Sequence, residues 1–168
     1  MKKIVLFASL LILSLSSFSQ IHDPVKWSTS VEKISDTEFD LIVQATIEEG
    51  WHLYSQNVPE DGPIPTTFSF EKTADYELVE STQEEEGHTI FDAVFEMEIK
   101  YFENRVIFKQ RVKNLTENSL KIRGEVEFMV CDDTRCLAPA RSRPECPCAR
   151  REQSRAWTCP RQSCLRCR

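Results

Sequence analysis

The sequence predicts an all-β protein, an antiparallel β-sandwich of immunoglobulin-like type. Three observations lead to this class: hydrophobic residues alternate with a period of two, no segment shows a convincing 3.6-residue stripe, and turn-forming clusters separate the alternating segments. Roughly six to eight strands in about 119 residues fit such a sandwich. The alternation stops near residue 138, so the pattern gives no sign of the last strand of the sandwich, and we expect a sandwich that can lack this strand.

Each expected strand corresponds to one alternating or apolar segment, which gives the strand one buried and one wet face. The long candidates are residues 39–48, 91–101 and 122–130, and the shorter ones are residues 25–31, 51–54, 66–70, 76–79 and 106–108. Turn-forming residues separate them at 59–63, 84–87 and 114–118. Residues 74–86 have helix propensity, but we interpret them as strand plus loop.

Composition bounds the function. The 168 residues carry 21 Lys+Arg against 27 Asp+Glu, and no apolar run approaches the length of a membrane span, about 18 residues. We therefore expect no membrane span in this chain and no nucleic-acid partner, because phosphate neutralisation requires clustered basic residues. Three scattered histidines share no metal-ligand spacing, so we expect no metal and no cofactor.

The two ends of the chain differ from its body. A signal peptide at residues 1–19 is predicted by Lys2 and Lys3, an apolar run over residues 4–15 and small residues at 17–19, and it implies an extracytoplasmic domain at 20–138. A buried N-terminal helix is the alternative. Residues 139–168 hold eight arginines, no lysine and five of the seven cysteines. A zinc site and a disulfide scaffold are alternatives for this tail, which we interpret as disordered or frameshifted.

The body contains two cysteines, Cys131 and Cys136, directly after the segment 122–130. The four residues between them can form a tight loop that brings the pair within disulfide distance. A disulfide that closes so small a loop removes little entropy from the unfolded chain and therefore stabilises the fold little. The pair thus suits redox chemistry better than a structural role, although a structural disulfide is the alternative. Arg135 favours a thiolate at Cys136, whereas the aspartates at 132 and 133 disfavour one at Cys131.

Four motifs together resemble the N-terminal periplasmic domain of DsbD, the membrane thiol:disulfide interchange reductase. They are Gly-Trp-His-Leu-Tyr-Ser-Gln at residues 50–56, Gly-Pro-Ile-Pro-Thr at 62–66, Phe-Asp-Ala-Val-Phe at 91–95, and the cysteine pair followed by Leu-Ala-Pro at 130–139. The resemblance covers most of residues 20–139. It departs from the family in three ways: His52 replaces a tyrosine, four rather than five residues separate the cysteines, and the expected closing strand, membrane domain and thioredoxin-like domain are not recognised after the pair.

The resemblance implies an immunoglobulin-like domain whose Cys131/Cys136 pair relays electrons. In the family, a thioredoxin-like periplasmic domain donates them, and the acceptors are periplasmic proteins such as a disulfide isomerase and cytochrome c maturation thioredoxins. Cys136 would form the mixed disulfide with these thioredoxin-like partners. The resemblance also implies an aromatic cap over the pair, formed by His52, Tyr54 and either Phe91 or Phe95. The rival interpretation is a non-catalytic secreted β-sandwich binding module with a structural disulfide.

Overall fold

The computed structural model describes residues 22–92, 95–116 and 120–144. All regular elements of this part are β-strands, which confirms the all-β prediction, and no helix in it is long and apolar enough to cross a membrane. The expected signal peptide and residues 145–168 of the tail lie outside the described residues. The strands are β1 (Val25–Lys33), β2 (Glu38–Ile47), β3 (His52–Tyr54), β4 (Thr67–Phe70), β5 (Tyr76–Glu84), β6 (His88–Asp92), β7 (Met97–Phe102), β8 (Arg105–Asn114), β9 (Gly124–Phe128), β10 (Val130–Cys131) and β11 (Ala140–Ser142).

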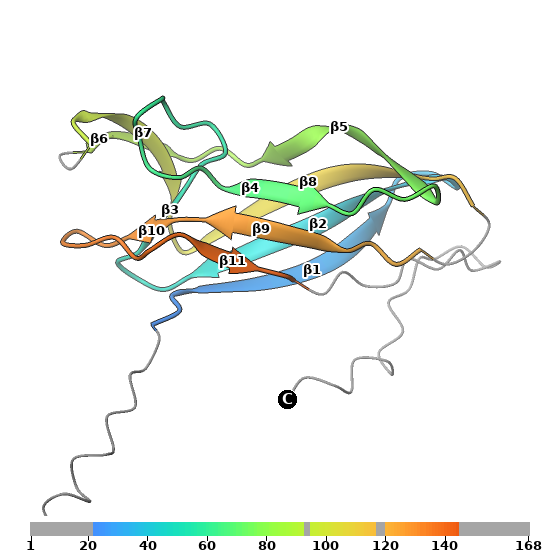
Figure 1. Cartoon of the computed structure of the whole chain (residues 1–168), viewed down its shortest axis with the longest axis horizontal. Helices are drawn as coiled ribbons and strands as arrows, with labels where there is room; N and C mark the ends of the chain where they lie inside the picture. Colours follow the sequence, from blue (N-terminus) through green and yellow to red (C-terminus); the bar gives the residue numbers. More distant parts are fainter. Residues whose placement is uncertain (1–21, 93–94, 117–119, 145–168) are drawn as a thin grey trace, which may run out of the picture.

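The strands form three antiparallel sheets, ordered β1-β2-β8-β5, β11-β9-β4 and β10-β3-β7-β6. The first two pack face to face as the layers of a sandwich, and the third lies at one end of it (Figure 1). Aromatic rings join the layers: Phe68 of β4 lies 4.9 Å from Phe108 of β8, and Trp27 of β1 lies 5.2 Å from Phe128 of β9.

The alternating patterns place the core as expected. Phe39 and Leu41 on β2 and Phe108 on β8 are completely buried. Burial of each such side chain contributes about 1.5–3 kcal/mol relative to an exposed one. On the opposite face of the same two strands, Asp40 and Arg111 are directly paired and form an ion pair. The pattern therefore specifies both the register and the buried face.

The long strand predicted over residues 91–101 is wrong, because the chain reverses within it. β6 and β7 form a hairpin in which Phe91 pairs with Glu98 and Asp92 with Met97. Glu96 adopts a positive φ of 54°, and the Asp92 carboxylate accepts a hydrogen bond from the Phe95 backbone N–H at 3.2 Å. The sequence pattern did not reveal this reversal, because Phe95 beside the turn is apolar and so continues the alternation.

The segment predicted as one strand over residues 122–130 divides into β9 and β10. β9 pairs with β4 and β11 in the second sheet, whereas β10 pairs with β3 in the third. Val130 lies opposite Leu53, and Cys131 lies opposite His52. This change of partner carries the cysteines from the sandwich layer to the end sheet.

A short strand follows the cysteines, where the sequence analysis expected the domain to end at residue 138. β11 pairs with β9, and Arg141 bonds Glu127 through Nη2 at 2.9 Å. Arg143 bonds Glu125 through Nε at 2.9 Å. The expected boundary is therefore wrong, and the domain continues at least to β11. The sequence of β11 shows no alternation because the strand has no buried apolar face, and ion pairs with β9 help to hold it in place.

Candidate functional site

The cysteine loop, residues 131–136, projects from the end of β10. Cys131 and Cys136 are joined by a disulfide and form an isolated antiparallel bridge, with their Cα atoms 4.0 Å apart. Backbone hydrogen bonds flank the pair, from Asp132 N to Arg135 O at 2.9 Å and from Leu137 N to Val130 O at 3.0 Å. This arrangement is the non-hydrogen-bonded type of cross-strand pair, in which facing side chains lie closest together.

Asp132 organises the cysteine loop. Its Oδ1 accepts hydrogen bonds from the Thr134 hydroxyl at 2.7 Å, the Thr134 backbone N–H at 2.8 Å and the Arg135 backbone N–H at 2.8 Å. The bonds from Thr134, followed by those from Arg135, lower the pKa of Asp132 to about 2. The loop therefore keeps a charged carboxylate at its base.

Arg135 is placed differently from the sequence-based argument. Its Nε donates to Asp132 Oδ2 at 3.3 Å, and its guanidinium lies 5.6 Å from the centre of the Trp51 ring. The positive charge thus has a carboxylate and an aromatic face as neighbours. That Arg135 favours a thiolate at Cys136 stays a prediction, and the same charge also neighbours the Asp132 carboxylate.

The two sulfur-bearing residues differ in accessibility. Cys131 is 4% exposed and belongs to a small apolar cluster with Tyr54, Ile99 and Tyr101, whereas Cys136 is half-buried. A cleft of about 430 Å³ opens beside the disulfide. It is lined by His52, Tyr54, Ile90, Phe91, Asp92 and all six residues of the cysteine loop. An attacking group therefore reaches Cys136 more readily than Cys131.

Tyr54 lies against the cleft as an uncharged phenol. It is 2% exposed, and its hydroxyl donates to Asp92 Oδ2 at 3.4 Å. Burial, and then the negative charge and hydrogen bond of Asp92, raise the pKa of Tyr54 well above its usual range. Asp92 consequently links Tyr54 to the β6–β7 reversal, since its other oxygen binds the Phe95 N–H. Asp92 was not among the predicted site residues, although an aspartate before a reversal is a common turn signal.

The two candidate cap phenylalanines take different positions. Phe91 is 64% exposed on β6 and lines the cleft. Phe95 is half-buried, packs on the cluster that contains both cysteines, and meets the Tyr54 ring edge-on at a centroid distance of 6.2 Å. The structure thus brings all six expected residues to one end of the fold, with Phe91 as a cleft wall and Phe95 in direct aromatic contact with Tyr54.

His52 faces the buried cysteine. It lies opposite Cys131 across β3 and β10, and its ring stacks obliquely on Tyr101 at 4.4 Å. Its Nε2 is 3.0 Å from Glu103 Oε1. Glu103 was not singled out by the sequence analysis, because a lone charge at a strand end is an ordinary surface feature.

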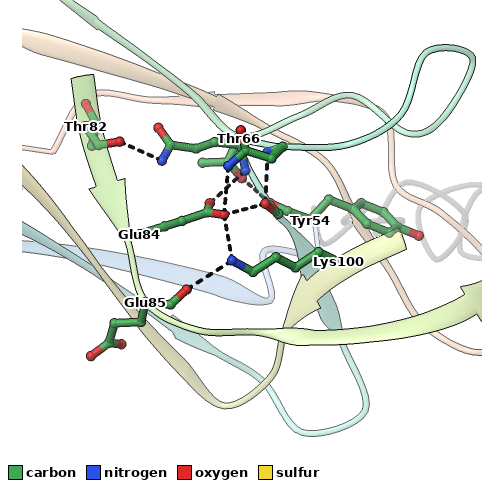
Figure 2. Close-up of polar contacts among 9 residues, drawn as sticks. Tyr54, Thr66, Thr82, Glu84, Glu85 and Lys100 are labelled. Atoms are coloured by element: carbon green, nitrogen blue, oxygen red, sulfur yellow. Dashed lines mark hydrogen bonds and ion pairs between the residues drawn. The ribbon is translucent and has the colours of Figure 1, made fainter. Parts of the chain in front are cut away.

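A polar network behind Tyr54 connects the end sheet with the sandwich (Figure 2). Glu84, at the end of β5, accepts hydrogen bonds from Ser55 Oγ at 2.6 Å, Gln56 N at 2.9 Å and Lys100 Nζ at 3.0 Å. The Thr66 hydroxyl donates to the Tyr54 carbonyl at 2.6 Å. These bonds hold the end of β3, and with it the backbone of Tyr54, against β5 and β7.

The site can support thiol–disulfide exchange, since one sulfur is accessible and the other is buried beside it. Among residues 22–92, 95–116 and 120–144, no three His, Cys, Asp or Glu side chains are arranged to hold a metal ion. A disulfide in a cleft at the end of a β-sandwich is therefore the chemical feature to compare with known proteins.

A solved structure shares the fold, and a second is similar over part of the chain. The N-terminal periplasmic domain of ScsB from Proteus mirabilis aligns with a TM-score of 0.54 at 13% identity, over 77% of this chain and 50% of that one. The Neisseria meningitidis DsbD N-terminal domain in the reduced form aligns with a TM-score of 0.47 at 9% identity, over 71% of this chain and 82% of that one. No curated protein sequence matches this chain.

A family model gives the assignment. The model described as "Thiol:disulfide interchange protein DsbD, N-terminal" matches residues 23–144, which include every strand from β1 to β11 and the whole cysteine loop. The resemblance drawn from the four sequence motifs is thereby confirmed. With its immunoglobulin-like fold and its disulfide at the end of the sandwich, this chain belongs to the family of DsbD N-terminal domains.

Proposed function

We propose that this domain works in the periplasm and relays electrons through the Cys131/Cys136 pair to thioredoxin-like partner proteins. The observation that carries the proposal is the asymmetry of the disulfide: Cys136 is half-buried beside a cleft, and Cys131 is 4% exposed. Family membership supports disulfide exchange in general. The periplasmic origin of the ScsB relative and the apolar N-terminal segment support the location.

The exchange runs in two steps. A thiolate of a dithiol partner attacks Cys136 Sγ, forms a mixed disulfide and breaks the Cys131–Cys136 bond, whose electron pair remains on Cys131 Sγ. The second partner thiol then attacks the partner's own sulfur and releases Cys136. The partner leaves as a disulfide, and the domain holds two thiols that can reduce an oxidised acceptor by the reverse sequence.

A trapping experiment tests this assignment. Cys131→Ser leaves Cys136 as the attacking thiol with no resolving partner, so it should accumulate a mixed disulfide with an oxidised thioredoxin-like protein. Cys136→Ser should not. The adduct should be located by peptide mass spectrometry, because the chain contains five further cysteines beyond residue 144. Equal trapping by both variants would contradict the assignment.

The reduction potential separates this function from its rival. In a binding module with a structural disulfide, the Cys131–Cys136 couple should lie below about −300 mV. A relay pair should lie in the range of catalytic couples, about −120 to −270 mV. A reduction potential below about −300 mV, together with no mixed disulfide trapped by Cys131→Ser, would favour the binding module.

A further inference from the structure

Four side chains lie in one row across the end sheet and the cysteine loop. Cys131 is paired on one side with Cys136 and on the other with His52. The His52 imidazole in turn lies 3.0 Å from the Glu103 carboxylate. Directly opposite residues in an antiparallel pair point to the same face, with Cβ atoms about 4.5–5.5 Å apart. The row is therefore a carboxylate, an imidazole, a buried sulfur and an accessible sulfur.

The surroundings of His52 favour proton exchange toward the disulfide. Its side chain is 20% exposed, one edge bonds Glu103, and one ring face is covered by Tyr101. Both His52 and Cys131 line the cleft beside the disulfide. The titratable and charged groups around them come from four places: Tyr54 of β3, Tyr101 of β7 with Glu103 just after it, His88 and Asp92 of β6, and Asp132, Asp133 and Arg135 of the cysteine loop.

We propose that His52 exchanges a proton with Cys131 Sγ during disulfide exchange, and that Glu103 is a positioning residue that orients the imidazole. This inference rests on the proposed function. When a partner thiolate attacks Cys136, the S–S bond breaks and its electron pair leaves on Cys131 Sγ. Because Nε2 of His52 is held by Glu103, the imidazolium then gives its Nδ1 proton to that sulfur, which becomes a thiol, and His52 becomes neutral.

The reverse direction uses the same atoms. After Cys136 has formed a mixed disulfide with an oxidised acceptor, neutral His52 removes the proton from the Cys131 thiol. Cys131 Sγ attacks Cys136 Sγ, the internal disulfide forms, and the electron pair leaves on the partner sulfur. Two electrons thus pass from the domain to the acceptor.

The physical reason is the burial of Cys131. A thiolate in an apolar cluster is disfavoured by desolvation, so an unassisted Cys131 would be a poor leaving group and a poor attacking group. A positioned imidazole removes this barrier in both directions, and positioned acid–base groups typically accelerate such steps by about 10²–10⁴-fold. A purely packing role for His52 would leave the ionisation of Cys131 unchanged.

The first measurement is the rate at which dithiothreitol reduces the disulfide of the full-length chain, followed as a function of pH at the Cys131 and Cys136 peptides. His52→Gln should slow reduction about a hundredfold and abolish an ionisation step in the pH profile. Glu103→Gln should show a smaller loss, and Glu103→Asp should restore part of it. The matched control is His88→Gln, since His88 also neighbours Tyr101, at 6.1 Å, but pairs with Tyr101 and not with a cysteine.

The second measurement separates this inference from the proposed function. In a Cys136→Ser background, the pH dependence of Cys131 alkylation is read by peptide mass spectrometry, which requires no partner protein. His52→Gln should shift that profile, and His88→Gln should not. If His52→Gln matches His88→Gln in both measurements, the inference is overturned even where the trapping of partners at Cys136 succeeds. If trapping fails but the alkylation profile shifts, the proposed function fails and the His52–Cys131 coupling stands.

Discussion

Replacement of Glu84 by glutamine should destabilise the fold by about 3 kcal/mol, a magnitude that follows from its buried contacts. The Glu84 side chain is 6% exposed and accepts hydrogen bonds from Ser55, Gln56, Asn57 and Lys100 (Figure 2). Glutamine keeps one acceptor oxygen but turns an N–H₂ donor toward the other donors. With the amide oxygen in the place of Oε1, the bond from Gln56 N is lost, at about 1.5–3 kcal/mol, and the bonds from Ser55, Asn57 and Lys100 lose their charge assistance. The total loss of unfolding free energy stays at about 3 kcal/mol because the Lys100 side chain, 27% exposed, can turn to water.

The loss should depend on pH. Burial raises the pKa of Glu84, but the hydrogen bonds from Ser55, Gln56, Lys100 and Asn57 outweigh burial and hold the pKa below its usual range. The folded state therefore binds this proton less readily than the unfolded state. The contribution of Glu84 is fully present above the pKa of a free glutamate, about 4.3. It disappears as the pH falls through the lower pKa of the folded state, so wild type and Glu84→Gln should converge in acid.

Urea unfolding monitored by tryptophan fluorescence measures both effects, with Trp27 and Trp51 inside the fold as reporters. The control is Glu86→Gln, which removes the same charge from an exposed loop position two residues away. The reasoning is refuted if Glu84→Gln is no more destabilising than Glu86→Gln at neutral pH, or if the difference between wild type and Glu84→Gln is the same in acid.

Two further predictions concern the cap and the edge of the sandwich. Phe95→Ala should raise the rate at which iodoacetamide labels the reduced Cys131/Cys136 pair several-fold, because Phe95 packs on Tyr54 and the cysteine cluster. Phe91→Ala should have a smaller effect, since Phe91 is 64% exposed, and the opposite order would identify Phe91 as the cap. Deletion of residues 139–144 should lower the urea midpoint and increase self-association in light scattering, because it uncovers the edge of β9. An unchanged midpoint and mass would show that β11 contributes nothing to the fold.

The fold class and most of the core were readable from the sequence. The alternation over residues 39–48 and at Val106 and Phe108 predicts which side chains are buried, because a pleated strand repeats every two residues. The cysteine pair could be placed at a strand end for the same reason. Reversals carry no such period, so the hairpin at Asp92 and Glu96 was read as continuous strand.

Some candidate site residues could likewise be predicted from local sequence, and others could not. Cys131 and Cys136 lie five positions apart, and their pairing needs only a tight local loop. Glu84, Asp92 and Glu103 come from three separate strands or strand ends, and nothing in their local sequence distinguishes them from ordinary surface carboxylates. Their roles appear only when β5, β6 and β7 are brought beside β3.

By itself the sequence determined the β-sandwich class, the buried faces of its long strands and the local cysteine pair, since each of these depends on periodicity or on a few adjacent residues. Only the tertiary structure decided that β10 leaves the sheet of β9 and pairs with β3. The same is true of the position of His52 between Glu103 and Cys131. The tertiary structure also decided that Arg135 contacts the Asp132 carboxylate and the Trp51 ring. The physical reason is that strand pairing and charge pairing join residues far apart in the chain, and their register is set by the packing of whole sheets rather than by any neighbour in sequence.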